Sequence, residues 1–233
     1  MAGAFFDIFL GDYEIEGMRF VIPRNLTTRQ FRGRFLLNEY ETDIERLYLH
    51  KYLAPSARVL ELGGCLGVMS CIINKLLHDP TKHVVLEPHP GLVPLLVANR
   101  DRNSCSYTVR QGVVSTAPYE TFYVHDLIVG GSTTRTTSRP LTVPGFTVER
   151  LAEAHGFAFD TLVLDIEGGE YDLFKALDQR IRQFHRIFLE LHDRADFPNK
   201  AAIAMCPELL KSQGFELLAE DRRGATQQVW SQR

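Results

Sequence analysis

The stretch Val59-Leu60-Glu61-Leu62-Gly63-Gly64-Cys65-Leu66-Gly67 decides the fold of this chain. An apolar run that contains one acid ends in a glycine-rich turn, and the apolar residues 68–73 that follow are typical of a helix. A strand, a tight turn and a helix start place backbone N–H groups and the positive end of a helix dipole beside a bound ligand. Glycines suit such a turn because a side chain would keep the backbone away from the ligand.

A second apolar segment ends in an acid at the position that a nucleotide-binding unit requires. His83-Val84-Val85-Leu86-Glu87 is typical of a strand, and its last residue lies 20 positions after Gly67. A carboxylate at the end of the second strand of a βαβ unit accepts hydrogen bonds from both hydroxyls of a ribose. Two cofactor classes fit, a nicotinamide dinucleotide and S-adenosylmethionine. Glu61 favours the second, because a carboxylate at the glycine turn attracts an ammonium group and repels a pyrophosphate.

Composition limits the classes of protein that remain. A chain of 233 residues forms one substantial α/β domain, and 45% hydrophobic with 24% charged residues are typical of a soluble globular protein. The net charge of −3 gives no sign of nucleic-acid binding. No apolar run reaches ~18 residues and no signal pattern opens the chain, so we expect no membrane span and no export. The four cysteines show no zinc spacing, which favours reduced thiols and a cytoplasmic location.

Strand-like and helix-like segments alternate along the chain. We expect strands at about 58–62, 83–87, 107–114, 161–166, 186–191, 215–219 and 227–231, and helices at 41–53, 66–78, 91–103, 147–155, 170–182 and 203–213. This alternation predicts an α/β, Rossmann-like sheet of seven mainly parallel strands with helices on both faces. The last strand follows a short polar loop instead of a helix, so it should return antiparallel beside the preceding strand.

The remaining segments lie outside this alternation. Residues 1–37 are expected to form a small β-rich extension with a hairpin around Gly11-Asp12, and residues 38–233 the main domain. The polar, threonine-rich segment 130–140 is either a lid or substrate loop, or a plain solvated connection. Arg135 and Arg139 within it, like the nearby residues 125–126, fit solvated surface better than an acceptor site.

Two further strand-like runs end in polar side chains, at 161–170 and 186–192. Because the carboxyl ends of parallel strands meet at one edge of a sheet, Asp165, Glu190 and His192 should converge near the glycine turn. Acids and an imidazole beside a methyl donor suggest a base that deprotonates a hydroxyl, an effect of about 10²–10⁴-fold in rate. The remaining catalysis would come from holding the acceptor oxygen, the methyl carbon and the sulfur in line.

Each of these residues also has a structural interpretation. Asp165 is the strongest functional candidate, because a carboxylate after an apolar run is costly to bury without a role. His192 fits a core histidine as well as a catalytic one, and Glu170 fits a helix start, where acids are favoured by the dipole. Asp165, Glu190 and His192 could bind a divalent metal, but their spacing does not require one, and we predict no metal site.

Together these motifs resemble the FkbM-like family of S-adenosylmethionine-dependent (class I) O-methyltransferases, over residues 34 to 192. The resemblance is carried by Tyr40-Glu41, the turn 61–67, Leu86-Glu87-Pro88-His89-Pro90 with Asn99 and Asn103, Asp165-Ile166-Glu167-Gly168-Gly169-Glu170, and Glu190-Leu191-His192. The Asp-Ile-Glu-Gly-x-Glu element is the most specific of these. Two positions depart from the family pattern: Val163 replaces a frequent Lys, and Gly63-Gly64 replaces Gly-Ala.

The resemblance implies methyl transfer from S-adenosylmethionine to a hydroxyl of a sugar, glycan or small natural product, with no nucleic-acid or membrane partner. The predicted cofactor residues are Glu61, Gly63, Gly64, Cys65, Gly67, Glu87, Pro88 and Val113. The predicted catalytic residues, which would face the acceptor, are Asp165, Glu167, Glu190 and His192. Acceptor recognition is expected in residues 1–40, 130–140 and 192–198.

Three other functions remain open at this point. A nicotinamide-dependent oxidoreductase is disfavoured by Glu61 and by the lack of an obvious Tyr-x-x-x-Lys pair on a helix. A nucleic-acid methyltransferase would carry Asn/Asp-Pro-Pro-aromatic where this chain has residues 165–168. A non-catalytic accessory module would retain the fold without turnover. We also expect Phe5, Phe6, Phe9 and Phe20 to cover the sheet, and not to form a dimer face.

Overall fold

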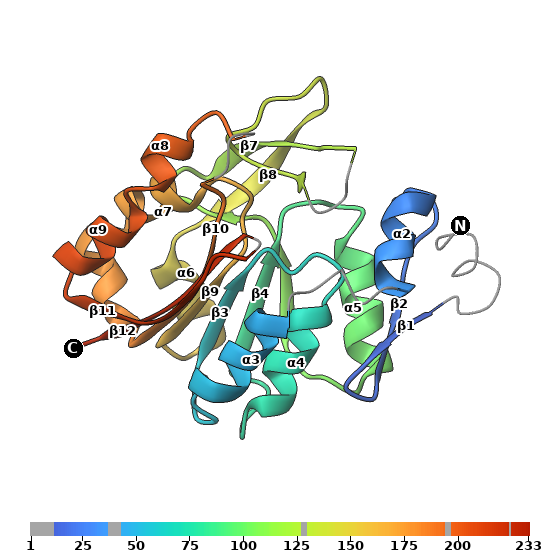
Figure 1. Ribbon diagram of the computed structural model, residues 1–233, viewed down its shortest axis with the longest axis horizontal. Helices are drawn as coiled ribbons and strands as arrows, with labels where there is room; N and C mark the ends of the chain where they lie inside the picture. The colour runs from blue at the N-terminus through green and yellow to red at the C-terminus, as the bar shows by residue number, and fades with distance from the viewer. Residues whose placement is uncertain (1–11, 37–42, 127–129, 194–196, 224) are drawn as a thin grey trace.

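The computed structural model describes residues 12–36, 43–126, 130–193, 197–223 and 225–233, and within these residues a seven-stranded sheet forms the centre (Figure 1). Across the sheet the strands are ordered β11 (Phe215–Asp221), β12 (Thr226–Gln232), β10 (Arg186–Leu191), β9 (Thr161–Leu164), β3 (Val59–Leu62), β4 (His83–Glu87) and β5 (Thr108–Gln111). The pairs from β10 to β5 are all parallel. Strand β12 is antiparallel to both of its neighbours, as expected, and lies between β11 and β10.

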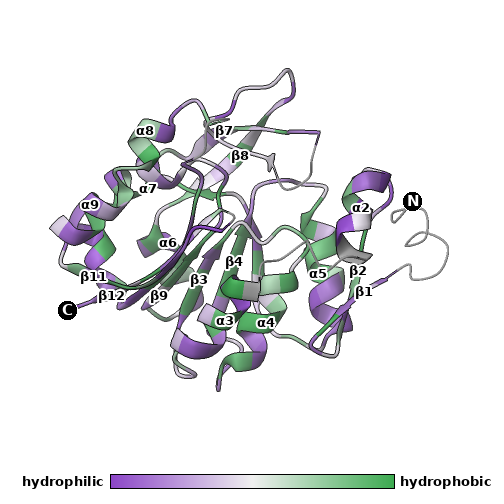
Figure 2. Ribbon diagram, in the orientation of Figure 1, coloured by the Kyte–Doolittle hydropathy of each residue, from purple (hydrophilic) through white to green (hydrophobic). Residues whose placement is uncertain are grey.

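Helices cover both faces of this sheet (Figure 1). One face is covered by α3 (Asp43–Tyr52), α4 (Val68–Leu76) and α5 (Val93–Arg102), and the other by α6 (Val148–His155), α7 (Glu170–Leu177) and α9 (Cys206–Ser212). Alternate residues of a strand point to opposite faces, so Val59 belongs to the first core and Leu60 to the second. Figure 2 shows the result: the central strands are largely hydrophobic, whereas the flanking helices carry both colours.

The N-terminal extension contains the expected hairpin, but with a different turn. Strands β1 (Asp12–Ile15) and β2 (Met18–Val21) pair across Glu16-Gly17, whereas the turn expected at Gly11-Asp12 lies partly outside the described residues. Gly17 has φ +74°, a left-handed conformation that is typical of a glycine in a tight turn. A helix that the sequence did not predict, α2 (Arg29–Leu36), follows the hairpin.

This hairpin is attached to α5. Asn99 Oδ1 accepts from the backbone N–H of Val21 at 2.8 Å, and Asn103 Oδ1 accepts from that of Arg19 at 2.9 Å. Phe20 is fully buried in the core on this side, as expected for a residue that covers the domain. Phe5, Phe6, Phe9, the Tyr40-Glu41 pair and the boundary between residues 37 and 38 lie outside the described residues.

The strand expected at 107–114 is divided in two. Strand β5 ends at Gln111, and Gly112 follows with φ +144°, where a Cβ would lie 2.4 Å from the carbonyl oxygen of Pro144. The chain then leaves the main sheet. In the described part of the chain, β6 (Val113–Val114), β8 (Pro140–Phe146) and β7 (Tyr119–Tyr123) form a three-stranded sheet that the sequence did not predict.

Two expected helices are also interrupted, and others are trimmed at their ends. The segment 170–182 changes at Asp178, which has φ +47°, from α7 to a 3₁₀ helix, η3 (Asp178–Gln183). The helix expected at 203–213 begins only at Cys206, as α9, after a break that separates it from the short α8 (Lys200–Ile203). Pro207 lies in the first turn of α9, where a missing N–H costs no helical hydrogen bond. In the described ranges, no helix is long and apolar enough to cross a membrane.

Candidate active site

A cavity of about 810 Å³ lies at the carboxyl ends of β3, β4 and β9, the edge that open α/β sheets use for ligands. Its wall contains all but one of the predicted site residues: Glu61, Gly63, Gly64, Cys65, Glu87, Pro88, Val113, Asp165, Glu167, Glu190 and His192. The sequence therefore located the cavity correctly. The exception is Gly67, which lies behind the turn: a Cβ there would meet Leu96 and Tyr107, 2.7 and 2.8 Å away.

The glycine turn after β3 is set by packing inside the protein. Gly63 has φ +96°, and a Cβ on it would lie 1.9 Å from the carbonyl oxygen of Asp165, which follows the neighbouring strand β9. On Gly64, a Cβ would lie 2.5 Å from Val85. The close approach that these glycines permit is thus first of all between neighbouring segments of the chain. From the sequence we had expected these glycines to allow close approach of the backbone to a ligand only.

Glu87, the last residue of β4, is a buried carboxylate at the edge of this cavity. Its Oε2 accepts from the backbone N–H of Cys65 and its Oε1 from that of His89, both at 2.8 Å. Burial raises the pKa of Glu87 to about 7, although the two N–H donors oppose this shift. Each oxygen keeps a lone pair that can accept from a ligand hydroxyl.

Glu61 also lines the cavity, but its carboxylate already has protein partners. The hydroxyl of Ser70 donates to Oε1 at 2.6 Å, and Nε2 of His83 lies 2.7 Å from Oε2. All three side chains are buried. Glu61 therefore links β3 to α4 and β4, and its expected role toward a ligand ammonium stays a prediction.

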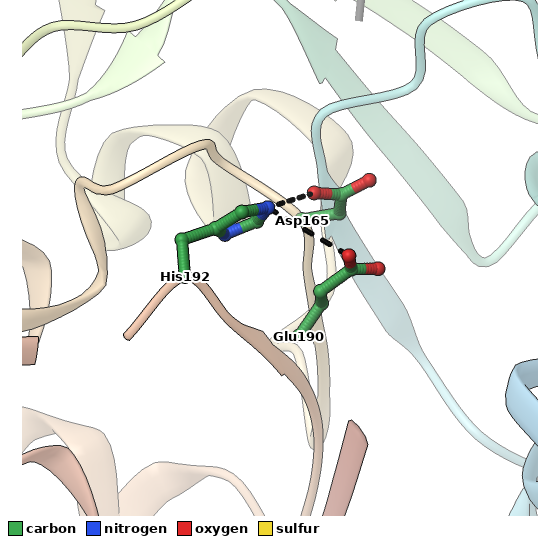
Figure 3. Close-up of side chains that lie close together, drawn as sticks. All are labelled: Asp165, Glu190 and His192. Carbon is green, nitrogen blue, oxygen red and sulfur yellow. Dashed lines mark ion pairs between the residues drawn. The ribbon is translucent and has the colours of Figure 1, made fainter. Parts of the chain in front are cut away.

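On the opposite side of the cavity, acids from β9 and β10 surround one imidazole (Figure 3). His192, only 5% exposed, places Nε2 at 3.6 Å from Asp165 Oδ1 and at 3.7 Å from Glu190 Oε1. Glu167 Oε2 also lies 3.7 Å from this nitrogen. The structure thus brings together the four residues that the sequence predicted as catalytic.

The charges of this cluster shift the pKa values of its members. Burial lowers the pKa of His192, but the hydrogen bond to Glu170 and the charges of Asp165, Glu170 and Glu167 outweigh burial and raise it to about 10. Burial and the charge of Glu190 raise the pKa of Asp165 well above its ordinary value, against the effect of His192. The Asp165 side chain keeps 46% exposure, which faces the cavity that it lines. At neutral pH His192 is an imidazolium, and Asp165 is the better candidate for a base.

Glu170 is the residue of the site whose role the sequence missed. It is the first residue of α7, as expected, but it is fully buried, and its Oε1 lies 2.5 Å from His192 Nδ1. The backbone N–H of Gly168 donates to the same oxygen at 3.1 Å. Among the described residues, Oε2 of Glu170 has no hydrogen-bond partner. A carboxylate on Nδ1 fixes the orientation of the ring and directs Nε2 into the cavity.

The threonine-rich segment forms part of the cavity wall. Gly130, Gly131, Thr133, Thr134 and Arg135 line it. The hydroxyl of Ser132 donates to the carbonyl of Glu167 at 2.7 Å, and that of Thr134 to the carbonyl of Gly168 at 3.2 Å. Of the two expected alternatives, the plain solvated connection is therefore wrong.

Arg135 corrects a second expectation. Its side chain is only 19% exposed; the guanidinium lies 3.7 Å from Glu167 Oε2 and 4.7 Å from the ring centroid of Phe197. It is thus part of the site and not solvated surface. Arg139 fits the surface prediction, because it is half exposed and pairs with the exposed Asp126 at 2.6 Å.

With this geometry established, comparison with known proteins assigns the family. Residues 61–217 match the Methyltransferase FkbM domain. The chain belongs to this family. The resemblance inferred from the sequence is therefore confirmed, and methyl transfer is favoured over nicotinamide-dependent oxidation. No curated protein sequence is significantly similar to this FkbM-family chain.

Solved structures with the same fold act on different acceptors. The FkbM-family chain is similar to an O-methyltransferase from Bacillus cereus in complex with SAH, with 11% identity, a TM-score of 0.55, and coverage of 98% of this chain and 94% of that one. It is also similar to the precorrin-6y C5,15-methyltransferase of Geobacter metallireducens GS-15 (14% identity, TM-score 0.52, coverage 92% and 93%). A third similar structure is the ribosomal protein L11 methylase of Lactobacillus delbrueckii subsp. bulgaricus, with 12% identity, a TM-score of 0.51, and coverage of 84% of this chain and 80% of that one. Likeness at such identities establishes the fold and leaves the acceptor open.

Proposed function

We propose that this FkbM-family chain is an S-adenosylmethionine-dependent O-methyltransferase whose acceptor is a hydroxyl of a sugar, glycan or small natural product. The observation that carries the proposal is a single cavity with two different sides. One side has the glycine turn and Glu87, and the other has Asp165 among His192 and Glu190. A methyl donor bound on the first side would direct its methyl group toward the second.

On the cofactor side, Glu87 would accept hydrogen bonds from the two ribose hydroxyls. Its orientation is fixed in advance by the N–H groups of Cys65 and His89. The backbone of Gly63 and Gly64 and the start of α4 would lie along the methionine moiety. Val113 and Pro88, also in the wall, would enclose the cofactor from the side of β4 and β6.

On the acceptor side, Asp165 would take the hydroxyl proton while the oxygen attacks the methyl carbon and the carbon–sulfur bond breaks. The products are the methyl ether, the neutral thioether of the cofactor and a protonated Asp165. The raised pKa of Asp165 brings it closer to the working pH, which makes a carboxylate a better base. His192, held by Glu170, would offset the negative charge that develops on the oxygen.

The acceptor class is supported by the polar groups of the wall. Besides the predicted site residues, the hydroxyl and carboxylate side chains that line the cavity include Ser115, Thr116, Glu120, Thr133 and Thr134. These groups can hydrogen-bond a hydroxyl-rich acceptor. The acids around Asp165 disfavour a polyanion such as nucleic acid. A cytoplasmic location is part of the proposal, because none of the four cysteines, all of which lie in the described ranges, forms a disulfide.

The test begins with calorimetric binding of S-adenosylhomocysteine, followed by transfer of labelled methyl to a panel of sugars, glycans, phenols, amines and RNA. We expect transfer to hydroxyls, and a loss of about 10²–10⁴-fold in kcat for Asp165→Asn with unchanged S-adenosylhomocysteine affinity. Glu208→Gln, an exposed acid on α9, is the matched control. Transfer only to amines or RNA would overturn the acceptor class, and absence of any cofactor binding would favour the accessory module.

A further inference from the structure

We propose that Asp165, Glu190 and His192 bind one divalent metal cation on the acceptor side of the cavity (Figure 3). One atom from each, Oδ1 or Oε1 of the acids and Nε2 of the imidazole, lies within 4.8 Å of the other two. The nitrogen is 3.6 Å from Asp165 and 3.7 Å from Glu190. A cation about 2.1–2.4 Å from the nitrogen and from each acid oxygen would make N–cation–O angles of about 100–120°, which flexible coordination tolerates.

The three atoms are free to bind a ligand. In the described part of the chain, Nε2 of His192 has no hydrogen-bond partner, although the residue is buried and this nitrogen is directed between the two acids. Asp165 likewise makes no side-chain hydrogen bond to a described residue, and its carboxylate faces the cavity. This nitrogen faces three carboxylates at 3.6–3.7 Å, beyond hydrogen-bond distance, so a cation could bind between it and the acids.

The groups behind the ligand atoms have the arrangement that metal sites use. Glu170 binds the other nitrogen of His192, Nδ1, at 2.5 Å. The amide of Gln227, on β12, donates to Oε2 of Glu190 at 2.6 Å and leaves Oε1 free. A metal-bound histidine almost always donates its second N–H to a carboxylate or carbonyl, and ligating carboxylates are themselves hydrogen-bonded. Glu170 on α7 and Gln227 on β12 thus support ligand residues that lie on or directly after another element, β10.

The acidic character of the cluster also favours a bound cation. Asp165, Glu167, Glu170 and Glu190 bring four carboxylates to one imidazole, and Arg135 reaches Glu167 from the loop. Within this cluster four acidic groups face two basic ones, His192 and Arg135. A divalent cation between Asp165 and Glu190, whose ligand oxygens lie within 4.8 Å of each other, would offset the charge of both acids.

The ligand set indicates the class of cation. Carboxylate oxygens and water suit Mg²⁺, Mn²⁺ and Ca²⁺, and the imidazole favours a transition metal within this group. Mn²⁺ meets both conditions, and three protein ligands leave positions for water or an acceptor oxygen. The use of the cation rests on the proposed function: it would bind the acceptor hydroxyl and lower its pKa. The binding of the cation itself does not depend on that function.

The experiment titrates the full chain, freed of metal by chelator and dialysis, with Mn²⁺, and measures free Mn²⁺ by electron paramagnetic resonance. We expect one site per chain, weakened at least tenfold in Asp165→Asn and in Glu190→Gln and unchanged in the exposed control Glu208→Gln. Glu170→Gln should weaken it by about 10–100-fold, as expected for a group that orients a ligand.

S-adenosylhomocysteine binding to each variant shows whether it is folded and whether the cofactor side is intact. Full cofactor binding without a stoichiometric Mn²⁺ site at millimolar metal would overturn the cation proposal and leave the methyltransferase proposal standing. A Mn²⁺ site that is equally strong in Asp165→Asn and Glu190→Gln would overturn it too. A Mn²⁺ site lost in those variants would support it even if no methyl transfer were found, because metal binding is measured without an acceptor.

Discussion

Binding of S-adenosylhomocysteine should depend on pH through Glu87. This buried carboxyl has a pKa raised to about 7, against an ordinary value of 4.5, because burial disfavours its charge. The ionised form offers four lone pairs, two of them used by the N–H groups of Cys65 and His89. A proton on either oxygen removes an acceptor that the ribose hydroxyls would use. The cofactor should therefore bind the ionised form more tightly and release a proton on binding near neutral pH.

The magnitude follows from the fraction of Glu87 that is ionised. With a pKa of about 7 this fraction is roughly 0.9 at pH 8 and 0.1 at pH 6, so the dissociation constant should rise about tenfold as the pH falls between these values. Folding stability should change with pH in the opposite direction to cofactor affinity. Because folding raises the pKa, the contribution of Glu87 to stability is fully present below pH 4.5 and is lost as the pH rises through about 7. Cofactor binding at pH 8 should offset that loss.

Calorimetry at pH 6, 7 and 8, in buffers of different ionisation enthalpy, gives both the affinity and the number of protons released. Glu87→Gln is the reference, because its side chain cannot ionise. At pH 8 this variant should bind S-adenosylhomocysteine more weakly than the wild type does, and its affinity should change little between pH 6 and pH 8. Subtracting its profile removes the titration of the ligand and that of Asp165 and Glu167, whose pKa values are also raised. Equal affinity of the wild type at pH 6 and pH 8, with no proton release, would refute the assignment of Glu87 to the ribose.

Three further predictions address the framework of the site. Gly63→Ala should lower the free energy of unfolding by at least about 2 kcal/mol more than Gly156→Ala. Both glycines have positive φ, but only a Cβ on Gly63 would clash with a neighbouring backbone oxygen. Equal losses in urea unfolding would contradict this. Glu170→Ala should cost about 3–5 kcal/mol in the same assay, because it removes the buried carboxylate that pairs with Nδ1 of His192, and a loss below about 1 kcal/mol would count against the pair. Iodoacetamide should label Cys65 before the three buried cysteines, and S-adenosylhomocysteine should slow that labelling; peptide mass spectrometry would show a different order if the cavity were closed.

The main sheet and the location of the site could be predicted because both follow from local rules. Central parallel strands are buried on both faces and therefore appear as short apolar runs, as in residues 59–62 and 161–164. The carboxyl ends of such strands meet at one edge, so Glu87, Asp165 and His192 could be brought together without any knowledge of their contacts.

The parts that could not be predicted depend on contacts between distant segments. Strand β8 includes Pro140, Pro144 and Gly145, residues that are unfavourable within a strand, so it is its pairing with β7 and β6 that makes it one. Arg135 lies in a loop of solvated composition that is held against the Gly168 turn. An acid at the first position of a helix looks the same in sequence whether it is solvated or, like Glu170, buried against a histidine.

The charges of the cavity connect the two proposals. The sulfonium of a methyl donor is positive, and its charge is lost as the methyl group leaves, so unneutralised acids near it would stabilise the bound donor more than the transition state. A site with several carboxylates around the acceptor therefore needs positive charge beside them, not only beside the cofactor. The proton on His192 supplies one charge and Arg135 supplies another, at Glu167. A divalent cation between Asp165 and Glu190 would take the place of that proton, supply two charges and bind the acceptor oxygen. The acids would then assist methyl transfer by holding the cation, in addition to the role of Asp165 as the base.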